Sequence, residues 1–504
     1  MTGLPDWLDP LFDAREMRAA DAWAIEEQSV PSLDLMERAG AGLARATARL
    51  ARGGQVLVLV GKGNNGGDGL VVARLLRQEG REVDVVATAP LGELKGDAAV
   101  NLERLPGERP RQWDGRALQN AGVVVDALLG TGFSGVPREP VAGAIAAINA
   151  QDPPVVACDV PSGVDAATGE VLGQAVRATV TATFHGPKIG LHVAPGAHHA
   201  GEVEVVEIGI PRGAPGAAGA GLIADRVLGL VPHRPRDGSK FSSGTVVVAG
   251  GSTGLTGAPT MAALAAMRAG AGYVQLAVPS STEVVFEVKL TESMTHPLPE
   301  RDGGHVAEGA ERVAELAQRA GAVVLGPGIG RGDGALAFAR EVASTVEAPI
   351  VIDADGLNAH AGDLETLRGR PGPTVLTPHA GELARLLGTD SGDVAAHRLA
   401  CARAAAERSG CVVLLKGDDT IVAAPGGPVA VSRGASPALA TAGTGDVLSG
   451  VIAAFLAKGL GPFEAASAGT QAHARAGREA AARLGADHTI AGDVIDTLPT
   501  ALQL

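Results

Sequence analysis

The sequence is poor in aromatic residues, in cysteine and in basic clusters, and each shortage excludes something. Its 504 residues include only 8 Phe, 3 Trp and 1 Tyr, so its cores must pack mainly from Val, Leu, Ile and Ala. Cys158, Cys401 and Cys411 cannot form a disulfide framework and have no CxxC spacing, so buried, reduced thiols are expected. The formal charge of −14, with no offsetting Lys/Arg cluster, argues against a nucleic-acid partner.

Long apolar runs are missing as well. No stretch reaches the ~18–20 apolar residues of a membrane span, and no charged segment followed by an apolar one opens the chain. We therefore expect no membrane partner and a cytoplasmic location. The apolar fraction of 46% and the charged fraction of 19% are ordinary for a globular chain. A chain of 504 residues exceeds what one hydrophobic core usually holds, so roughly two to four domains are expected.

Short β-branched runs instead alternate with Ala-, Leu- and Arg-rich stretches along most of the chain. In the first half we predict strands over 55–60, 83–87, 123–126, 155–159, 179–184 and 203–208. In the second half we predict them over 244–249, 273–278, 322–325, 349–353, 373–376 and 412–415. Continuous apolar strands between amphipathic helices favour α/β folds with parallel sheets covered on both faces. The linker-like segment 211–221 (PRGAPGAAGAG) predicts domains over 1–220 and 221–504.

A glycine-rich turn, GKGNNGGDG over 61–69, follows the first predicted strand. Bare backbone N–H groups beside a carboxylate, at a strand or helix end, are where proteins hold phosphate-bearing ligands. The spacing Gly61-x-Gly63-x-x-Gly66 matches the dinucleotide fingerprint, which also needs an acid at the carboxyl end of the second strand. Asp84 lies at the start of that strand instead, and the helix is expected to begin only near Asp68. A standard dehydrogenase site is therefore disfavoured.

Acids end two further strands of the first half. Asp126 is followed by ALLGTGFSG, and Asp159 is followed by VPSGVD. Ligands bind outside the carboxyl ends of strands in open parallel sheets, so these ends and the glycine turn are expected to share one edge. Each Asp alone is equally explained as a turn or helix cap. Asn65, Asp126 and Ser162 together offer hard oxygen ligands, which suit a hard cation and not zinc.

The second half has a glycine-and-acid turn of its own, Ala442-Gly-Thr-Gly-Asp446, directly before the helical run 447–458. A helix dipole contributes about 0.3–1 kcal/mol, whereas micromolar nucleotide affinity needs roughly 8 kcal/mol. Other loops must therefore contribute to binding. The loops that follow predicted strands are the candidates: Gly326-Pro-Gly-Ile-Gly330, Asp353-Ala-Asp355 and Lys416-Gly-Asp-Asp-Thr420.

The segment Thr377-Pro-His-Ala-Gly-Glu382 supports two interpretations. Thr377 as N-cap and Pro378 as first helical residue are ordinary helix-start chemistry. Glu382 in the first turn is explained by the helix dipole. Neither feature needs His379, which is either a structural side chain or part of a site.

The first half contains VPSLDLMERAG, GKGNNGGDG, VVVDALLGTGFSG, CDVPSGVD and TFHGPKIGL in that order. Together they resemble the NAD(P)H-hydrate epimerase family. The resemblance implies a Rossmann-like three-layer sandwich, with Asp159 as acid/base residue and a potassium ion held by Asn65, Asp126 and Ser162. It also implies that the hydrated nucleotide contacts Asp159 and the following residues: Asn64, Asn65, Gly66, Gly67, Asp68, Gly130, Thr131, Gly132, Phe133, Ser134, Gly135 and Val136. Lys188 is a candidate for neutralising a phosphate.

The second half contains SGTVVVAGG, GLTGAPTMAALAAMRAGAGYV, VLGPGIG, VIDADGLN, LTPHAGE, LLKGDDTIVA and ATAGTGDVLSGVIAAFLAKG. They resemble the ribokinase-like superfamily and, within it, NAD(P)H-hydrate dehydratase. The resemblance implies a ribokinase-like α/β domain with Asp446 as general base. It implies that the hydrated dinucleotide contacts Ala258, Gly328, His379 and Asp446. The adenine nucleotide, ADP or ATP with Mg²⁺, would contact Lys416, Gly417, Asp418, Asp419, Thr420 and Gly445.

The two resemblances imply a bifunctional isomerase and lyase that repairs hydrated NADH and NADPH, called NADHX and NADPHX. The first half would equilibrate the R and S epimers, and the second would phosphorylate the hydroxyl of the S form and eliminate phosphate. Two alternatives stay open: a ribokinase-like kinase of a vitamin-type alcohol with a regulatory first half, and a first half reduced to a scaffold. A homo-oligomer is also expected. The residues alone decide neither ADP against ATP nor NADHX against NADPHX, and they leave the roles of Lys188 and Lys240 undecided.

Overall fold

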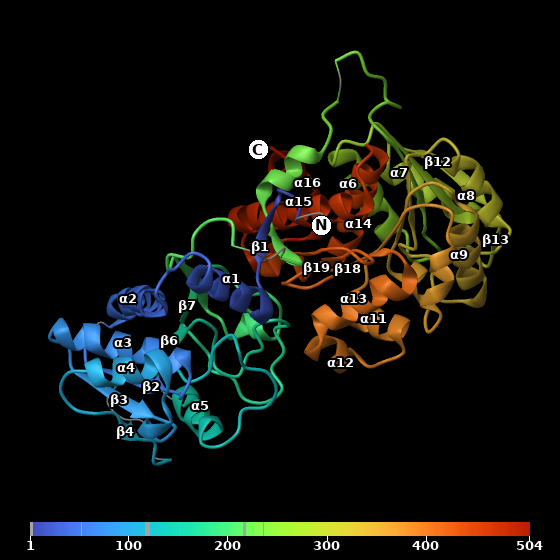
Figure 1. Ribbon diagram of the computed structural model, residues 1–504. Coiled ribbons are helices and arrows are strands. Elements are labelled where there is room, and N and C mark those ends of the chain that lie inside the picture. The colour runs from blue at the N-terminus through green and yellow to red at the C-terminus, as the bar shows by residue number, and fades with distance from the viewer. Residues whose placement is uncertain are drawn as a thin grey trace. The chain divides into compact units, whose positions relative to one another are not determined.

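The chain forms two compact units (Figure 1). The computed structural model describes residues 4–51, 53–115, 121–150, 152–214, 218–234 and 236–503. One unit contains Pro10–Ala220, and the other contains Gly221–Leu504 together with Pro5–Asp9. Among the described residues, no helix is long and apolar enough to cross a membrane. Cys158, Cys401 and Cys411 are all buried, and none forms a disulfide.

The first unit is built on a seven-stranded sheet in the order β4-β3-β2-β5-β6-β7-β8. Neighbouring strands run parallel throughout. The strands are β2 (Gln55–Val60), β3 (Val83–Ala87), β4 (Arg111–Gln112), β5 (Ala121–Ala127), β6 (Val155–Cys158), β7 (Val180–Phe184) and β8 (Glu202–Val206). The helices are α1 (Ala14–Glu26), α2 (Ser32–Leu50), α3 (Asn64–Gln78), α4 (Gly96–Arg104) and α5 (Val141–Asn149).

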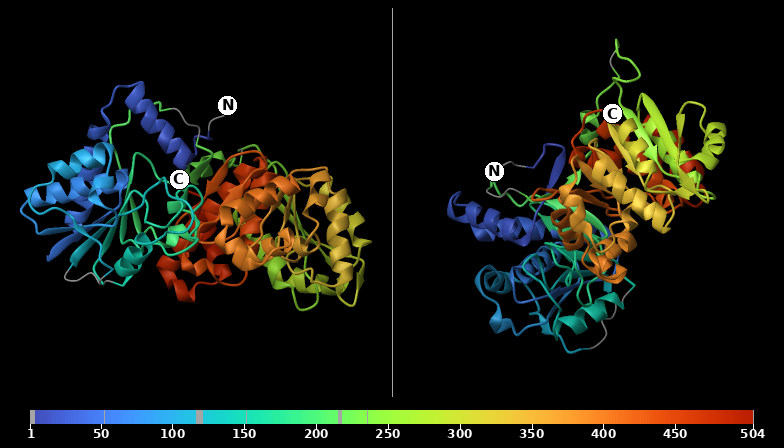
Figure 2. Two further views of the ribbon diagram at one scale, coloured as in Figure 1. Left: turned by 60° about the horizontal axis from the view of Figure 1, so that its bottom comes forward. Right: turned by 90° about the vertical axis from the view of Figure 1, so that its right-hand side faces the viewer.

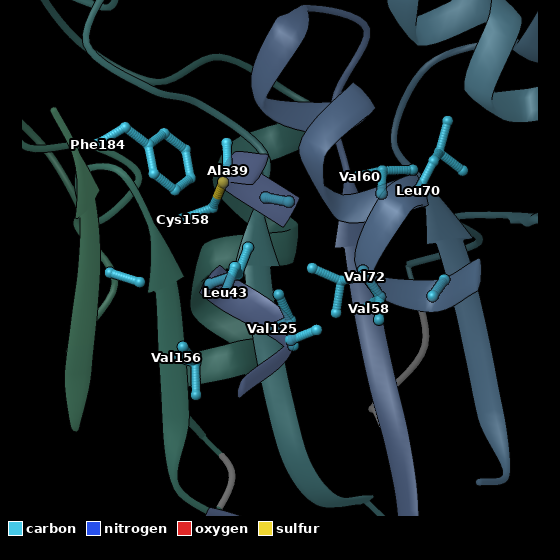
Figure 3. Close-up of a cluster of buried hydrophobic side chains, with 14 of the residues drawn as sticks. Ala39, Leu43, Val58, Val60, Leu70, Val72, Val125, Val156, Cys158 and Phe184 are labelled. Carbon is cyan, nitrogen blue, oxygen red and sulfur yellow. The ribbon is translucent and has the colours of Figure 1, made fainter. Parts of the chain in front are cut away.

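Alternate residues of the central strand β2 enter two different cores, one on each face of this sheet. Val58 packs with Leu43 of α2 and Val72 of α3 (Figure 3). Leu57 packs with Ile145 of α5 in a separate cluster. Because successive side chains of a strand point to opposite faces, helices must cover both faces of so apolar a strand. The result is a three-layer sandwich.

Helix α3 begins at Asn64, before the start predicted near Asp68, and three glycines lie in its first turns. A Cβ on Gly66 would lie 2.0 Å from the carbonyl oxygen of Gly61, and one on Gly69 would lie 2.7 Å from Ala127 Cβ. A glycine within a helix costs roughly 0.5–1 kcal/mol relative to alanine. The close approach of α3 to β2 and β5 outweighs that cost, so a helix forms where the glycines had predicted a turn.

The second unit is built on an eleven-stranded sheet in the order β1-β9-β20-β19-β18-β17-β16-β15-β10-β11-β12. The neighbouring strands in the part β18-β17-β16-β15-β10-β11-β12 run parallel, whereas β19 pairs antiparallel with both β18 and β20. The strands are β1 (Leu8–Leu11), β9 (Ala220–Ile223), β10 (Thr245–Ala249), β11 (Tyr273–Pro279), β12 (Met294–Leu298), β15 (Ala322–Leu325), β16 (Ile350–Ile352), β17 (Thr374–Leu376), β18 (Val412–Leu415), β19 (Ile421–Ala423) and β20 (Val429–Val431). A small hairpin, β13 (Glu300–Arg301) with β14 (Gly304–His305), lies outside this sheet.

Helices of the second unit fall into two groups that pack among themselves (Figure 2). One group contains α6 (Gly257–Arg268), α14 (Thr444–Ala457), α15 (Pro462–Leu484) and α16 (Ala491–Ala501). The other contains α8 (Gly309–Ala317), α9 (Asp333–Thr345), α10 (Asp355–Asn358), α11 (Ala380–Leu387), α12 (Ser391–Ala396) and α13 (Arg398–Ser409). The short α7 (Glu283–Lys289) packs on β12.

The first residues of the second unit are firmly held. Trp7 is 4% exposed, and its ring lies 5.5 Å from that of Phe463 between centroids. Arg226 Nη2 contacts Asp9 Oδ1 at 2.7 Å. Strand β1 is the neighbour of β9 in the large sheet. The N-terminal segment is thus an integral part of the unit that holds the C-terminal half of the chain.

Candidate active sites

The first unit contains a cavity of about 1190 Å³ at the carboxyl edge of its sheet. Most small-molecule sites measure ~300–1,000 Å³, so this cavity has room for a dinucleotide. The predicted substrate contacts that line it are Asn64, Asn65, Asp68, Asp159 and all of 130–136. Gly66 and Gly67 are not part of this lining, because they pack against the Gly61 carbonyl and the Met36 side chain respectively.

Asp159 follows β6 in a left-handed backbone conformation, with φ of 65°, that few non-glycine residues adopt. Its Oδ1 accepts hydrogen bonds from Lys188 Nζ at 2.5 Å, Phe184 N at 3.2 Å and Thr183 Oγ1 at 3.3 Å. Its Oδ2 accepts one from Thr131 Oγ1. These donors fix the carboxylate in the cavity wall and offset the cost of the unusual backbone.

Lys188 is fully buried, and its ammonium donates to Asp159 Oδ1, to Thr183 Oγ1 at 2.9 Å and to the Phe184 carbonyl at 2.7 Å. All three partners of the ammonium lie inside the protein, which does not favour the expectation that Lys188 neutralises a phosphate. Burial pushes the pKa of Asp159 up, but Lys188 and the other donors outweigh burial and hold that pKa below its ordinary value. Asp159 is therefore ionised throughout the neutral range.

Further carboxyl groups line the same cavity, among them Asp68 and Asp21. Asp68 is 7% exposed, and burial with the nearby charges of Asp159, Asp21 and Asp97 raises its pKa well above the ordinary value. Asp21, on α1, has a pKa raised to about 6, chiefly by burial. The cavity thus combines one carboxyl group whose pKa is lowered, that of Asp159, with two whose pKa is raised, those of Asp68 and Asp21. No motif pointed to Asp21, because it lies in a helix with ordinary amphipathic spacing.

Asn65, Asp126 and Ser162 come together beside the cavity, as predicted for a cation site. Ser162 donates to Asp126 through its Oγ at 2.6 Å and its backbone N at 2.8 Å. The Leu129 carbonyl accepts from Asn65 Nδ2 at 2.8 Å and from Ser162 Oγ at 3.3 Å. Burial raises the pKa of Asp126 to about 6, and no cationic side chain is among the groups that shift it. A buried carboxylate surrounded by oxygen donors fits a hard cation of low charge.

Candidate residues of the second unit follow the carboxyl ends of neighbouring parallel strands. Gly328, after β15, has φ of 69°, and its carbonyl accepts from Ser252 Oγ at 2.9 Å in the loop after β10. Ala258 is the second residue of α6. On the same helix, Met261 lies so close to Gly443 that a Cβ there would be 2.5 Å from Met261 Sδ. These contacts join the loops after β10 and β15 to the start of α14.

Asp446 lies in the first turn of α14, whose N-cap residue Gly443 has φ of 92°. Burial raises the pKa of Asp446 to about 7, with Asp353 and Glu382 adding to the rise and Lys416 opposing it. A helix N-terminus favours the ionised form by only about 0.3–1 kcal/mol, which is less than one pKa unit. Burial and the acidic neighbours therefore win, and Asp446 exchanges a proton near neutral pH.

Lys416 lies among these acids at the start of α14. Its Nζ contacts Asp353 Oδ1 at 2.9 Å and Glu382 Oε2 at 3.8 Å. Burial alone would lower the pKa of Lys416, but these two carboxylates raise it above the ordinary value. Asp353 is 1% exposed, and its Oδ2 accepts from Ser449 Oγ at 2.5 Å. Ser449, which sequence reasoning did not single out, thereby ties α14 to the end of β16.

His379 is the N-cap of α11, the role expected for Thr377. Its Nδ1 accepts from the backbone N of Gly381 at 2.9 Å and of Glu382 at 3.4 Å, while its own N donates to Glu382 Oε2 at 2.8 Å. Thr377 is fully buried, and its Oγ1 donates to the Ile352 carbonyl at 3.4 Å. The side chain of His379 remains 56% exposed, so a ligand can still reach the ring.

The segment Lys416–Thr420 forms the turn between the antiparallel strands β18 and β19. Arg398 of α13 binds Asp419 through Nε to Oδ2 at 2.9 Å and through Nη2 to Oδ1 at 2.7 Å. Thr420 Oγ1 donates to the Gly417 carbonyl at 2.8 Å. Two of the predicted nucleotide contacts therefore use their side chains to hold the loop in shape. Lys240, whose role was undecided, places its Nζ 5.1 and 4.7 Å from the ring centroids of Phe241 and Tyr273.

Comparison with known families gives a match for each half of the chain. The family model of NAD(P)H-hydrate dehydratase matches residues 246–500. The family model of the YjeF-related protein N-terminus matches residues 32–190.

Individual relatives match nearly the whole chain. The bifunctional NAD(P)H-hydrate repair enzyme Nnr of Moorella thermoacetica is 42% identical over 515 residues, which cover 98% of this chain and 96% of the relative. The enzyme of the same name from Salinibacter ruber is 42% identical over 523 residues, which cover 97% and 95%. Among solved structures, ADP/ATP-dependent NAD(P)H-hydrate dehydratase from Bacillus subtilis, co-crystallised with ATP/Mg²⁺, is 26% identical with a TM-score of 0.49 and covers 56% of this chain and 96% of that one.

Proposed function

This chain belongs to the family of bifunctional NAD(P)H-hydrate repair enzymes, and we propose how its residues carry out the two reactions. It epimerises hydrated NADH and NADPH, and it dehydrates the hydrate to NAD(P)H at the expense of ADP or ATP. Because full-length relatives match both halves, the prediction of a combined isomerase and lyase is confirmed. The alternative of a vitamin-type kinase with a regulatory first half is set aside.

In the second unit, the observation that carries the proposal is the pKa of Asp446, raised to about 7 beside the glycine amides of the α14 start. A base of that pKa accepts a proton from the hydroxyl of the hydrated ring near neutral pH. The hydroxyl oxygen then bonds to the terminal phosphorus of ADP, the bond from that phosphorus to the bridging oxygen breaks, and AMP leaves. The amides of Gly443 to Gly445 would stabilise the charge that develops on the transferring group. The phosphorylated ring then loses a proton and releases inorganic phosphate, which restores the dihydronicotinamide. Ala258, Gly328 and His379 would hold the dinucleotide.

Binding of the adenine nucleotide is assigned to the β18–β19 turn and to Gly445. The position of Lys416 supports this role, because its Nζ lies close to Gly445: a Cβ added to that glycine would be 3.4 Å from it. Mg²⁺ is expected to enter with the nucleotide and to neutralise its phosphates. Among the described residues, no three His, Cys, Asp or Glu side chains are arranged to hold a metal ion, so Mg²⁺ would depend on the phosphates of the nucleotide for ligands. The preference for ADP in place of ATP is expected from the resemblance to bacterial members.

In the first unit, we assign substrate binding to Asn64, Asn65, Asp68 and 130–136 and the acid/base role to Asp159, and the position of these residues in the lining of one cavity supports the assignment. Asp159 is permanently ionised by Lys188, so it serves as a proton acceptor. Thr131 links it to the 130–136 loop. The scaffold alternative for the first half is disfavoured because these groups are all present and converge on one cavity.

Potassium is the cation proposed for the first unit, held by Asn65, Asp126 and Ser162. The buried, unpaired charge of Asp126 supports this choice, and a bound cation would supply positive charge that anchors the start of α3 and the loop after β5. Epimerisation should slow when potassium salts are replaced by a bulky organic cation, while dehydration continues. An Asn65→Ala variant should lose that sensitivity; an unchanged rate without potassium would remove the ion from the proposal.

A homo-oligomer remains expected and is testable by sedimentation.

The two activities separate in one experiment on the full chain. A mixture of R and S hydrate is supplied with ADP, and recovery of the dihydronicotinamide absorbance and release of inorganic phosphate are followed. Full recovery in two phases needs both units, whereas about half recovery indicates dehydration of the S form alone. A stable phosphorylated product without release of phosphate would contradict the proposal for the second unit.

A further inference from the structure

Helix α1 forms one wall of the cavity in the first unit. Its lining residues are Met17, Arg18, Asp21 and Ile25. Residues at these spacings share one helical face, and Asp21 is the acid on it. The helix begins beside the Asp159 site, because the backbone of Phe12 pairs with that of residues 187–189. The helix thus presents a carboxyl group to the same space as the Asp159–Lys188 pair.

Asp21 has no evident structural role. The neighbouring acids Asp13 and Glu16 cap α1 and hydrogen bond to backbone N–H groups at its start. Asp21, by contrast, makes no hydrogen bond or ion pair with any residue that the structure describes. The charges of Lys188 and Asp159 both act on it, so it lies near them. A largely buried carboxyl group without a partner is costly to keep and is typical of functional sites.

The chemistry of epimerisation asks for such a second group, given the function proposed above. Exchange between R and S breaks the bond from the ring carbon to its hydroxyl oxygen, and that oxygen leaves as water after accepting a proton. The ring that remains is a cation, and the electron pair of the ring nitrogen stabilises it until water is added again. A water molecule then bonds to the same carbon from the other face and gives up a proton. Atoms and electrons balance with no oxidant or reductant.

Asp159 serves poorly as the donor in this scheme. Its two oxygens accept four hydrogen bonds, including the one from Lys188, which holds it ionised. Asp68 has the opposite defect, because burial and the neighbouring carboxylates raise its pKa well above the ordinary value. Asp21 lies between these extremes. We propose that Asp21 is a second catalytic residue of the epimerase site, giving a proton to the departing hydroxyl or taking one from the incoming water.

The groups around Asp21 give it a suitable acidity. Arg18 is on its own helix, Lys188 and Asp159 face it from the loops after β7 and β6, and Asp68 faces it from α3. Burial raises the pKa of Asp21 to about 6, which Lys188 lowers and Asp159 raises. A general acid–base group works best when its pKa is close to the working pH. This acidity supports the geometric argument.

The test uses the full chain with ADP and the hydrate mixture, where the fast phase is consumption of S and the slow phase is limited by epimerisation. Asp21→Asn should slow the second phase by at least about 100-fold, towards the spontaneous rate, with the fast phase unchanged. Asp21→Glu should keep a larger share of the rate. Glu26→Gln, an exposed acid on the same helix, should match the wild type. If the wild type itself shows no catalysed slow phase, the epimerase function is refuted. That result is distinct from a failure of the role of Asp21, in which the wild type is active and Asp21→Asn is equally active.

Stability and pH distinguish a catalytic from a structural role. The folded-state pKa of Asp21 is raised, so its ionisation costs stability as pH rises from about 4 to about 6. Asp21→Asn should therefore melt at a higher temperature than the wild type at pH 7. The epimerisation rate of the wild type, plotted against pH, should change around pH 6, and this change should be missing in Asp21→Asn. A slow phase within twofold of wild type in Asp21→Asn, or equal loss in Asp21→Glu, would overturn the proposal.

Discussion

The candidate catalytic aspartates of the two units, Asp159 and Asp446, are held in opposite ways. Each follows a strand or opens a helix beside a glycine-rich segment, and each has a lysine nearby. In the first unit Lys188 contacts Asp159 itself, at 2.5 Å, and the pKa of Asp159 falls below its ordinary value despite burial. In the second unit Lys416 contacts Asp353 at 2.9 Å, and the pKa of Asp446 rises to about 7 because burial and acidic neighbours prevail.

Acidity therefore depends on which acid the lysine contacts, and not on whether a lysine is present. A direct contact fixes a carboxylate as a permanent anion, suited to orienting groups and accepting a proton. A lysine bound to a neighbouring acid leaves the second carboxyl group to titrate near neutral pH, as general-base catalysis requires. Under the function proposed above, one chain would use the same pair of residue types for two kinds of chemistry.

The largest effect is expected at the titrating aspartate. Asp446→Asn should lower the dehydration rate by about 10²–10⁴-fold, because an amide cannot accept the proton of the hydroxyl. Epimerisation should be unaffected. The rates are read from phosphate release and from interconversion of the R and S forms by chromatography. Near-normal dehydration would contradict the role of Asp446.

The corresponding change in the first unit is Asp159→Ala. The R form should then stay unconverted, with dehydration of the S form intact, because the cavity loses its ionised carboxylate and Lys188 loses its partner. The slow phase of absorbance recovery measures this loss. Interconversion clearly faster than the spontaneous rate would exclude Asp159 as the acid/base residue.

Separating the ion pair tests the comparison through stability. Lys188→Met leaves Asp159 buried without its cation, which should cost about 3–5 kcal/mol of unfolding free energy. The pKa of Asp159 would then be raised, so the loss should grow as pH rises above about 4 and should shrink in acid. Urea unfolding at several pH values measures it.

The double variant Asp159→Asn with Lys188→Met is the matched control for that loss. It removes both charges together and should recover most of the stability. A double variant as unstable as Lys188→Met would show that the pair is not the origin of the effect.

The smallest effect is expected from a neighbour of Asp446. Dehydration should fall about tenfold per pH unit below pH 7, because the base must be ionised. Glu382 is one of the acids that raise the pKa of Asp446, so Glu382→Gln should move this limb to lower pH. The amide oxygen of Gln can still accept from the His379 backbone and preserve the cap. If the fall in dehydration rate occurs at the same pH in Glu382→Gln as in the wild type, it reports the titration of a group other than Asp446.

Much of the fold could be read from apolar runs. Every predicted strand is present within two residues of its predicted limits, and the predicted α/β fold class is confirmed. Among the strands that were not predicted, β1 and β12 form the edges of the large sheet, and β4 forms an edge of the smaller one. The others are short: β9, β19 and β20 inside the large sheet have three or four residues each, and β13 and β14 form the separate hairpin. Edge strands have fewer neighbours and need no continuous apolar run, so periodicity does not reveal them.

The candidate sites were predictable where chemistry follows a strand end, and less so elsewhere. Asp126 and Ser162 meet as expected, because their strands are neighbours in the sheet. The Lys188–Asp159 contact depends on a loop conformation that no spacing encodes. Asp21 carries no signal, since any amphipathic helix has acids on one side. The helix-start chemistry predicted for Thr377 applies two residues later, at His379, because Thr377 is buried against β16.

The passage of Pro5–Asp9 into the second unit has a practical consequence for anyone dividing this protein. The polypeptide passes from one unit to the other after Asp9 and again after Ala220, so a single cut cannot yield two intact halves. A fragment starting at Gly221 would lack Trp7, whose ring contacts that of Phe463, and would leave β9 without its neighbour β1. Expressing the dehydratase half alone should therefore require the first residues of the chain to be grafted back or supplied as a peptide.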